Sequence, residues 1–533
     1  MKFAGCSSVA LQAVLIALVV FSGRTLSAQE VSRVFLKGPY LQGPGTDTMT
    51  IKWEAPTNTQ GMVRYGLEGK TDLQLRIETP RPLVLETNTV YLYEATLTNL
   101  QPESIYTYIA ETAGARTAPK KFRTFPIHHS KVTFIAYGDV RTNPKTHAAV
   151  VANFKRYSPD FFLLTGDLVA DGRRYELWGR EFFGPLTQVV DEIPMLPSLG
   201  NHEGDGNKYL HYMHLPGKDR WYSFDIGPVH LLALDYHFEK DNDDQFAFAQ
   251  KDLMASKAPW KLVFLHYPVF NIGGHATGWG HANYLPLFHR AKVDLVVTGH
   301  SHIYERFLPI AGQSGEATWP ITHITTGGGG APLARSQPHP SLISAASTNH
   351  FVVIEATETT LKGRAILTNN SVLDTFELEK RNGQPSPAYI AQVYPEEALK
   401  FFYEAGPSLT GSLASAPSTN SSAQTMFTIR PLKAIEHPAQ IEISLTKDSA
   451  RSYELENGPL KVTTPSATES NKVVWARIRA KNGNGTGDSG EGLLSPPLIF
   501  QGRMVVGAVE TVAYGQRSRI TDSAVEAAKN RDK

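Results

Sequence analysis

The sequence predicts three folded parts: an N-terminal β-sandwich, a central layered α/β domain and a C-terminal β-rich domain. Three observations support this division. Short alternating strands separated by turns occupy residues 31–126, buried apolar strands alternate with helical segments over residues 131–380, and short strands return over residues 426–515. The chain has 533 residues, of which 41% are hydrophobic and 19% charged, so it contains enough apolar material for several globular cores.

Residues 1–28 are typical of a secretory signal peptide. Lys2 precedes an apolar run from Val9 to Phe21, and cleavage is expected after Ala28. The run is shorter than the roughly 20 residues of a membrane span, so no span is expected after signal removal; an uncleaved anchor is the alternative. The only cysteine, Cys6, lies in this segment. We therefore expect a secreted or periplasmic protein whose fold needs no disulfides.

The segment 31–126 resembles a fibronectin type III β-sandwich. It contains the strand-like stretches TMTIKWEA, GMVRYG, TVYLYEATLTNL and SIYTYIAETA, with turns between them. In the stretch LQPESIYTYIA, the resemblance implies that Tyr106 forms a hydrogen bond with nearby backbone at a strand corner. Trp53 is expected to be the central aromatic residue of this core.

Five apolar strands of the central segment end in polar side chains of the kind that bind metals. The stretches are VTFIAYGD, DFFLLTGD, PMLPSLGNHE, KLVFLHYP and DLVVTGHSH, ending at Asp139, at Asp167, at Asn201 and His202, at His266, and at His300 and His302. A glycine precedes the polar residue in four of the five, which lets the backbone turn sharply there. Because ligands collect beyond the carboxyl ends of buried parallel strands, we expect these side chains to meet at one edge of the sheet.

The histidine pair in the stretch GHSH is a second indication of a metal site. Two imidazoles two residues apart share one face of an extended strand, so His300 and His302 can each bind one of two adjacent ions. Two carboxylates, one amide oxygen and three imidazoles form a nitrogen and oxygen donor set that suits Zn²⁺, Mn²⁺ or iron. The lack of thiolates disfavours soft metals.

The ordered motifs GD, GD, GNHE, a histidine after a buried strand, and GHSH resemble those of the calcineurin-like metallophosphoesterases. The likeness is greatest to the purple acid phosphatase-like group. The stretches that carry this likeness are GPYLQ near Gly38, HIYERF from His302 to Phe307, and TTGGGGAP from Thr325 to Pro332. The resemblance covers about residues 35–378 and implies a central β-sandwich flanked by helices. It does not extend to the C-terminal β-rich segment.

The resemblance also implies two metal ions that share one carboxylate, Asp167. The first ion would bind Asp139, Asp167 and His302, and the second would bind Asp167, Asn201, His266 and His300. Two such ions bind a phosphoryl group, lower the pKa of a bridging water and neutralise charge during an in-line attack. His202 follows a ligand without being one, and is expected to protonate the leaving oxygen or to bind phosphate.

Two positions depart from the family pattern at the first metal ion. Ala170 stands where the purple enzymes carry a tyrosine ligand, and Arg141 stands where other branches carry a histidine. Without the tyrosine, we expect no purple colour and weaker binding of the first ion. His147, at the start of a helix capped by Asn143, is either a substitute ligand or a packed histidine. Tyr175 is a more distant substitute.

Arg141 and His275 are the expected substrate-binding residues. The planar guanidinium group of Arg141 matches two phosphoryl oxygens, and a salt bridge to an acid such as Asp171 is the alternative. His275 lies in the stretch NIGGHATGWGH, after the His266 strand, where related enzymes form their substrate pocket.

The remaining segments are an irregular linker over residues 381–425, a β-sandwich-like domain over residues 426–515 and a polar tail over residues 516–533. The formal net charge of +1 gives no nucleic-acid-binding signature. We therefore expect an exported metal-dependent phosphoesterase that hydrolyses phosphate monoesters. The alternatives are a phosphodiesterase with the same site, and a surface- or polymer-binding protein with a degraded phosphatase domain.

Overall fold

The computed structural model describes residues 34–127, 131–217, 220–238, 243–275, 277–311, 319–336, 341–390 and 393–395, together with eight strands between residues 409 and 512. The predicted signal peptide of residues 1–28, the predicted tail of residues 516–533 and much of the predicted linker lie outside the described residues. Among the described residues, no helix combines the length and the apolar character that a membrane crossing requires.

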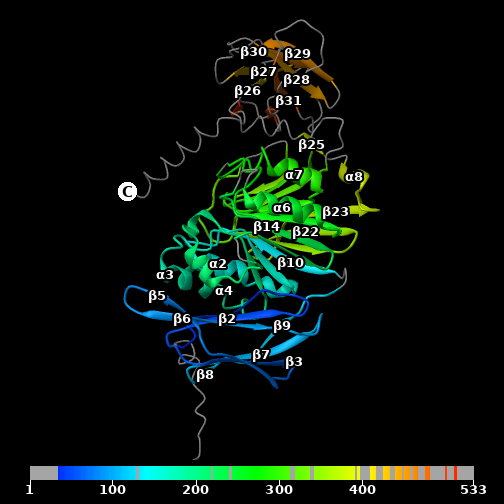
Figure 1. Ribbon diagram of the computed structural model, residues 1–533. Coiled ribbons are helices and arrows are strands. Elements are labelled where there is room, and N and C mark those ends of the chain that lie inside the picture. The colour runs from blue at the N-terminus through cyan, green and yellow to red at the C-terminus, as the bar shows by residue number, and fades with distance from the viewer. Residues whose placement is uncertain are drawn as a thin grey trace, which may run out of the picture.

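The N-terminal domain is a sandwich of two antiparallel sheets (Figure 1). One sheet has the strand order β1-β2-β6-β5, and the other has the order β4-β3-β7-β8, with β9 paired to β7. The strands are β1 (Lys37–Gln42), β2 (Met49–Ala55), β3 (Gly61–Leu67), β4 (Leu73–Ile77), β5 (Arg81–Val84), β6 (Thr89–Leu97), β7 (Ile105–Thr112), β8 (Ala115–Arg116) and β9 (Lys120–Arg123). The fold confirms the predicted N-terminal sandwich.

The two aromatic predictions for this domain are confirmed. Trp53 is fully buried in the core and stacks on Tyr93, with ring centroids 5.1 Å apart. The backbone N–H of Gln101 donates a 2.8 Å hydrogen bond to the hydroxyl oxygen of Tyr106, which ties the strand corner to the start of β7. Both residues therefore serve the stability of the sandwich.

The central domain contains two seven-stranded sheets. The first has the order β12-β11-β10-β21-β22-β23-β24, and the second has the order β13-β14-β15-β16-β19-β17-β20. The strands of the first are β10 (Val132–Tyr137), β11 (Phe161–Leu164), β12 (Met195–Pro197), β21 (His350–Ala356), β22 (Thr360–Leu367), β23 (Val372–Arg381) and β24 (Gln384–Pro385). Those of the second are β13 (Tyr222–Ile226), β14 (Val229–Ala233), β15 (Trp260–Leu265), β16 (Leu295–Thr298), β17 (Tyr304–Phe307), β19 (Thr322–Thr326) and β20 (Leu342–Ala346).

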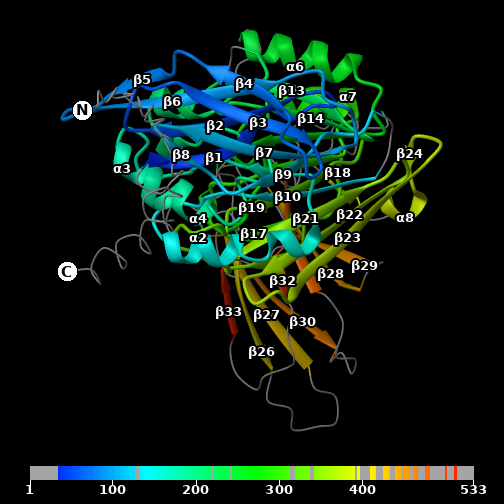
Figure 2. The same ribbon diagram turned by 90° about the horizontal axis from the view of Figure 1, so that it is seen from below.

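Helices cover the outer face of each sheet (Figures 1 and 2). The first sheet is covered by α2 (Pro144–Val151), the π-helix η2 (Trp178–Phe183) and α4 (Gly184–Leu186), and the second by α6 (Asp244–Ala255) and α7 (Tyr284–Ala291). The shorter helices are η1 (Phe154–Tyr157), α3 (Tyr175–Leu177), η3 (Asn201–Glu203), α5 (Asn207–Tyr212) and α8 (Pro387–Ile390).

Alternation along the strands explains this arrangement. On β10, Phe134 and Ala136 face the core between the two sheets, whereas Ile135 and Tyr137 face the core beneath the first set of helices. Because successive strand residues point to opposite faces, a strand that is apolar at every position is buried on both sides. The result is four layers in the order helix, sheet, sheet, helix, which confirms the predicted central fold.

The parallel strands bring their carboxyl ends to one region of this domain. Strands β10, β11 and β12 run parallel in the first sheet, and β14, β15, β16 and β19 run parallel in the second. The expectation that one sheet edge would supply every candidate ligand is therefore wrong, since the ligands follow strands of both sheets. Because the two sheets pack face to face, the carboxyl ends of their parallel strands lie close together although no strand of one sheet pairs with a strand of the other.

The N-terminal domain packs on the central domain through specific hydrogen bonds. The hydroxyl group of Tyr40 donates to the carbonyl of Tyr212 at 2.8 Å, and that of Tyr108 donates to the carbonyl of Asp191 at 2.8 Å. The backbone N–H of Leu41 donates to the carbonyl of Val190 at 2.9 Å. Both sheets of the sandwich therefore contact the central domain.

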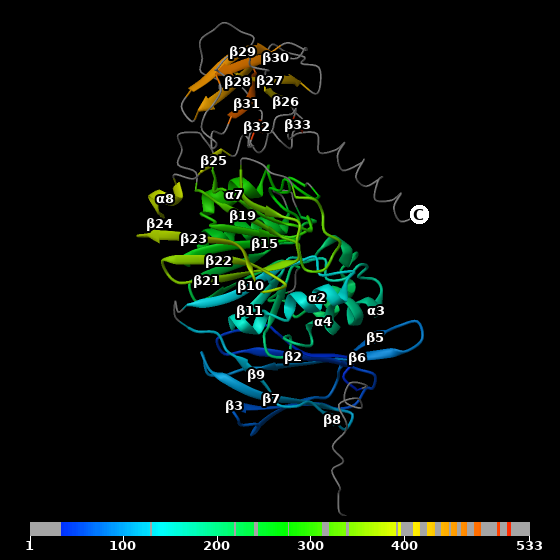
Figure 3. The same ribbon diagram turned by 180° about the vertical axis from the view of Figure 1, so that it is seen from behind.

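The C-terminal strands form two four-stranded antiparallel sheets, with the orders β30-β27-β26-β33 and β29-β28-β31-β32 (Figure 3). The strands are β26 (Leu409–Ser415), β27 (Gln424–Pro431), β28 (Ala439–Thr446), β29 (Ser449–Leu455), β30 (Leu460–Pro465), β31 (Val474–Ala480), β32 (Leu498–Phe500) and β33 (Val509–Val512). This region is β-rich, as predicted. The predicted linker of residues 381–425 is not irregular throughout, since it contains β24, α8, β25 (Tyr394–Pro395) and β26, and β25 pairs with β18 (Ile310–Ala311) of the central domain.

Candidate metal centre

The candidate ligands follow directly on the ends of the parallel strands. Asp139 follows β10 and Asp167 follows β11, whereas His266 is the residue after β15. Asn201 begins η3 after β12, and the histidine pair His300 and His302 follows β16. Four of these residues have positive φ angles, namely Asp139 at 55°, Asp167 at 55°, His300 at 67° and His302 at 43°. A left-handed backbone is costly for non-glycine residues and is typical of functional sites, where packing maintains it.

Close approach of the strand-end loops explains two of the glycines. A Cβ atom on Gly200 would lie 2.1 Å from the backbone nitrogen of Asp167, and one on Gly166 would lie 2.8 Å from Nδ1 of His266. Gly166 also has a φ of +89°. These two glycines allow the loops after β11 and β12 to meet beneath the ligands.

Four donor atoms converge at the second metal position. Nε2 of His266 lies 2.8 Å from Oδ1 of Asn201, 3.2 Å from Oδ1 of Asp167 and 3.3 Å from Nδ1 of His300. Bonds of roughly 2.0–2.2 Å to one metal ion place its donor atoms roughly 3 Å apart. Nδ1 of His266 donates to the carbonyl of Thr165 at 2.8 Å, which leaves the lone pair on Nε2, facing the other donors. The second position fits a metal ion.

The first metal position has three donors. Oδ1 of Asp139 is buried, has no hydrogen-bond partner among the described residues, and lies 3.3 Å from Nε2 of His302. Nδ1 of His302 donates to the carbonyl of Pro332 at 2.9 Å, so its lone pair is also on Nε2. Ligand atoms of Asp139, Asp167 and His266 all lie within 4.8 Å of one another, which places the two positions side by side.

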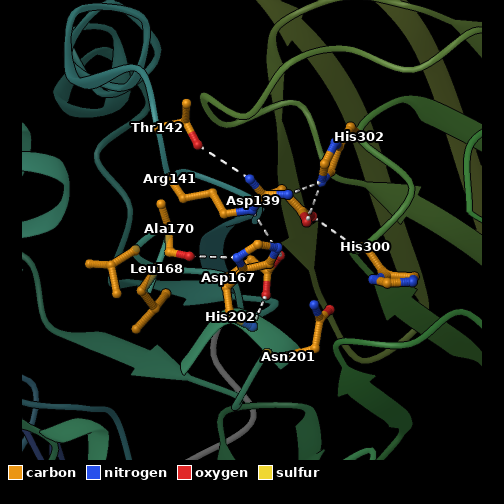
Figure 4. Close-up of polar contacts among 12 residues, drawn as sticks. Asp139, Arg141, Thr142, Asp167, Leu168, Ala170, Asn201, His202, His300 and His302 are labelled. Carbon is orange, nitrogen blue, oxygen red and sulfur yellow. Dashed lines mark hydrogen bonds and ion pairs between the residues drawn. The ribbon is translucent and has the colours of Figure 1, made fainter. Parts of the chain in front are cut away.

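Arg141 lies at the first position and contacts two of its donors (Figure 4). Its Nε donates to Oδ2 of Asp167 at 3.1 Å, and its Nη2 donates to Nε2 of His302 at 3.3 Å. Nη1 donates to the hydroxyl of Thr142 at 3.2 Å. The alternative of a salt bridge to a nearby acid is confirmed for Asp167 and not for the example Asp171, whose carboxylate pairs with Arg173 at 2.9 Å.

The two candidate substitute ligands, His147 and Tyr175, have partners away from the first metal position. His147 lies in α2, which begins after the predicted Asn143 cap, and is fully buried. One of its ring nitrogens bonds to the hydroxyl of Tyr137 at 3.1 Å and the other to the carbonyl of Glu181 at 2.9 Å. Burial lowers the pKa of His147 to about 4. With both nitrogens occupied, His147 is a packed histidine, and its candidacy as a metal ligand is wrong.

Tyr175 is also removed from the site. Its hydroxyl group donates a 2.6 Å hydrogen bond to Oε1 of Glu54, a residue of the N-terminal sheet. The tyrosine therefore belongs to the contact between domains. The sequence already made Tyr175 a distant candidate for the missing tyrosine ligand, and the loop after Asp167 places its side chain at the N-terminal domain instead of at the metal position.

His202 lies at the cluster without joining either donor set. Its Nδ1 donates to the carbonyl of Ala170 at 2.7 Å, and its Nε2 lies 3.8 Å from Oδ2 of Asp167. About a third of its side chain is exposed, so the ring borders the solvent-accessible side of the cluster. This placement suits a proton donor better than a metal ligand.

His275 lies beside the cluster on its exposed side. The centroid of its ring is 5.3 Å from that of His300 and 5.4 Å from that of His302. The residue itself is exposed. The structure therefore brings His275 next to His300 and His302 on the exposed side of the cluster.

Glu203 organises the loops and was missed as a functional residue from the sequence. Its buried carboxylate accepts hydrogen bonds from the backbone N–H groups of Gly200 at 2.7 Å, Leu168 at 2.7 Å and Asp167 at 3.0 Å. These bonds join the loop after β11 to the loop after β12. The glutamate of the GNHE stretch was the available signal for this role.

Glu181 performs the same function for the neighbouring loops. Its Oε2 accepts from the backbone N–H of Ala170 at 2.8 Å and from that of Thr142 at 3.1 Å. The loops after β10 and β11 are thereby held together beside Arg141. Glu181 lies in η2, and no motif in the sequence marks it.

The charge states of Asp167 and His300 suit metal binding. Burial raises the pKa of Asp167, but the charges of His266, His202 and Arg141 outweigh burial and lower this pKa to about 2. Burial, together with neighbouring imidazoles, lowers the pKa of His300 to about 2. At neutral pH, Asp167 is therefore a carboxylate and His300 a neutral imidazole, which are the forms that bind metals.

Comparison with known proteins follows the same division of the chain. Residues 132–304 match the calcineurin-like phosphoesterase family, and residues 37–124 match the purple acid phosphatase N-terminal domain. Purple acid phosphatase 21 of Arabidopsis thaliana is 28% identical over 315 residues, which are 54% of this chain and 69% of the relative. Acid phosphatase type 7 of Mus musculus is 26% identical over 369 residues, which are 59% of this chain and 82% of the relative.

A solved structure shares the fold. The structure of PhoD matches with a TM-score of 0.53 over 66% of this chain and 92% of the PhoD chain, at 11% sequence identity. At this identity the match concerns the fold alone.

Proposed function

Since the chain is a hydrolase that combines a calcineurin-like phosphoesterase domain with a purple acid phosphatase N-terminal domain, we propose that it hydrolyses phosphate monoesters in a metal-dependent reaction. One observation carries the proposal. Donor atoms of Asp167, Asn201 and His300 each lie within 3.3 Å of Nε2 of His266, although the four residues follow strands of two different sheets. Chance placement of polar loop residues does not give such convergence.

The proposed cofactors are two ions of zinc, manganese or iron. Asp167, Asn201, His266 and His300 would hold one, and Asp139, Asp167 and His302 would hold the other, with Asp167 shared. When bound, such ions supply Lewis acidity and a more acidic water. The donor set is composed of carboxylate, amide and imidazole groups, which suits these metals.

The side chains around the ions would bind the substrate and move a proton. His202 would protonate the leaving oxygen through Nε2, since its Nδ1 is engaged by Ala170. Arg141 has five N–H donors, and three of them have partners among the described residues. The other two would bind phosphoryl oxygens. His275 would contact the substrate at the mouth of the site.

Export belongs to the proposal as well. The apolar segment within residues 1–28 favours a secreted or periplasmic location, in which the phosphoester substrate would be met outside the cytoplasm. Sequencing the N-terminus of the protein recovered from the exported fraction tests this point. A chain that keeps Met1 and stays in the cytoplasm would contradict it.

The reaction is tested with a phosphate monoester and a diester, 4-nitrophenyl phosphate and bis(4-nitrophenyl) phosphate, after reloading the purified chain with Zn²⁺, Mn²⁺ or iron. We expect hydrolysis of the monoester and loss of both activities in Asp167→Asn, because this carboxylate is shared by both donor sets. Asp171→Asn is the matched control, since Asp171 pairs with Arg173 outside the cluster. Preference for the diester would favour a phosphodiesterase. Turnover that survives Asp167→Asn would place the chemistry elsewhere.

A further inference from the structure

The guanidinium group of Arg141 contacts the donor atoms that a first metal ion would need. It donates to Oδ2 of Asp167 at 3.1 Å and to Nε2 of His302 at 3.3 Å. Figure 4 shows the group lying between these two side chains. The third donor, Oδ1 of Asp139, is buried and has no hydrogen-bond partner among the described residues. Arg141 therefore contacts two of the three donors, whereas Oδ1 of Asp139 lies 3.3 Å from Nε2 of His302.

The contact with His302 excludes simultaneous metal binding. Nδ1 of His302 donates to the carbonyl of Pro332 at 2.9 Å, so the neutral form of the ring, which is the form that binds metals, has its one lone pair on Nε2. That lone pair accepts the hydrogen bond from Nη2 of Arg141. It cannot bind a metal ion at the same time. Metal binding at the first position thus requires Arg141 to leave His302.

Charge adds to this competition. Asp139 and Asp167 are the two carboxylates of the cluster, and the guanidinium group of Arg141 already balances one of them. The side chain of Arg141 is 14% exposed, so water screens its charge only partly. A divalent ion at the first position would be repelled by this fixed positive charge as long as Arg141 stays in place.

The second metal position is free of this competitor. Its donors on Asn201, His266 and His300 face one another, and the described contacts of Arg141 do not include them. Asp167 serves this position through Oδ1, whereas Arg141 contacts Oδ2. The two positions therefore differ both in the number of donors and in access to them.

We propose that Arg141 is a built-in competitor for the first metal ion, and that the two ions bind in separate steps. This inference rests on the proposed metal-dependent function. The ion at Asn201, His266 and His300 binds first and tightly. The ion at Asp139 and His302 binds only when the guanidinium group moves away, so that its occupancy follows the free metal concentration. The displaced guanidinium then has two more N–H donors for the phosphoryl group of a substrate.

The test is calorimetric titration of the full chain with Mn²⁺ after treatment with a chelator. We expect one tight step and a second step that is roughly 10–100-fold weaker in the wild-type protein. Arg141→Ala should tighten the weak step by a similar factor and leave the tight step unchanged. Arg141→Lys should fall between the two, because a single ammonium group keeps the charge but cannot reach both donors together.

Arg173→Ala is the matched control, since Arg173 is an exposed arginine of a neighbouring loop that pairs with Asp171, and it should leave both steps unchanged. Circular dichroism shows whether each variant is folded. If Arg141→Ala does not fold, the comparison of Arg141→Lys with the wild-type protein still tests the inference. Two equally tight ions in the wild-type protein, or a weak step unaffected by Arg141→Ala, would overturn this inference while leaving the proposed function intact. A lack of any Mn²⁺ binding would overturn both.

Discussion

His202 is fixed in one orientation by a single backbone group. Its Nδ1 donates to the carbonyl of Ala170 at 2.7 Å, and its own backbone N–H donates to Oδ1 of Asp167 at 3.0 Å. The ring can therefore carry a transferable proton only on Nε2, which lies 3.8 Å from Oδ2 of Asp167. This arrangement is the basis for the proposed role of His202 as the acid for the leaving group.

The role of His202 predicts an effect that depends on the leaving group. His202→Ala should lower kcat for phenyl phosphate by roughly 10²–10⁴-fold, because a poor leaving group needs a proton. The loss should be much smaller for 4-nitrophenyl phosphate, whose leaving oxygen is stable without one. Steady-state kinetics with both substrates measures the difference. His214→Ala is the control, since His214 pairs with Glu94 away from the cluster, and equal losses on both substrates would contradict the assignment.

At this scale, the sequence was informative where chemistry follows directly on a strand. Asp139 and His266 could be recognised because each is a metal-binding residue type at the end of an apolar run. His147 could not be excluded as a metal ligand from the sequence. Its position in a predicted helix indicates which face of the helix it lies on, but not which groups contact its ring. Glu203 and Glu181 act by accepting hydrogen bonds from backbone N–H groups. Such a role produces no periodic pattern in the sequence, so it could not be predicted.

At the scale of the elements, the strands were predictable but their division between two sheets was not. Strand β10 pairs with β11 in parallel and with β21 in antiparallel orientation, and β21 lies more than two hundred residues further along the chain. A strand buried on both faces has the same apolar composition in either sheet. Pairing depends on packing between distant segments, so the sequence predicted where each strand ends but not which strands are neighbours.

The second sheet contains a charged contact that joins three elements. His230 of β14 bonds through Nδ1 to Asp225 of β13 and through Nε2 to Asp252 of α6, each at 2.8 Å. Burial opposes the charge of His230, but the two carboxylates outweigh burial and raise its pKa to about 9. The imidazolium form therefore holds the hairpin of β13 and β14 against the helix.

This contact predicts a pH dependence of stability. Because the folded-state pKa of His230 is raised, its contribution is complete below its unfolded pKa of about 6.5 and is lost as the pH rises through about 9. The wild-type protein should be more stable at about pH 6 than at about pH 9, and we expect His230→Gln to reduce this difference in the free energy of unfolding by roughly 1–2 kcal/mol. The expected value is small because Asp225 is largely exposed and water screens its charge. Urea unfolding of both proteins at the two pH values measures it. A variant with the same pH dependence as the wild-type protein would show that His230 is not charged in the fold.

At the scale of the whole molecule, a buried charge joins the N-terminal domain to the central domain. Glu54 of β2 forms an ion pair with Lys37 of β1, and both side chains are almost fully buried. The carboxylate also accepts hydrogen bonds from the hydroxyl groups of Tyr175 at 2.6 Å and Tyr212 at 3.0 Å, both from the central domain. Nζ of Lys37 lies 3.7 Å from the centre of the Tyr175 ring. The sandwich thus anchors the segment that follows the Asp167 loop.

Removing one partner of this pair should be costly, whereas removing both should cost less. Glu54→Ala leaves Lys37 buried without its counter-charge and removes the acceptor of two tyrosines, so we expect a loss of about 3–5 kcal/mol in the free energy of unfolding. The double variant Lys37→Met and Glu54→Leu should recover most of this loss, since well-packed apolar residues replace buried charges at little cost. Glu111→Ala, which breaks the more exposed pair with Arg64, is the control and should cost no more than about 1 kcal/mol. Chemical unfolding of the three variants distinguishes these cases. A Glu54→Ala protein as stable as the Glu111→Ala protein would show that this buried charge contributes little to the contact between the domains.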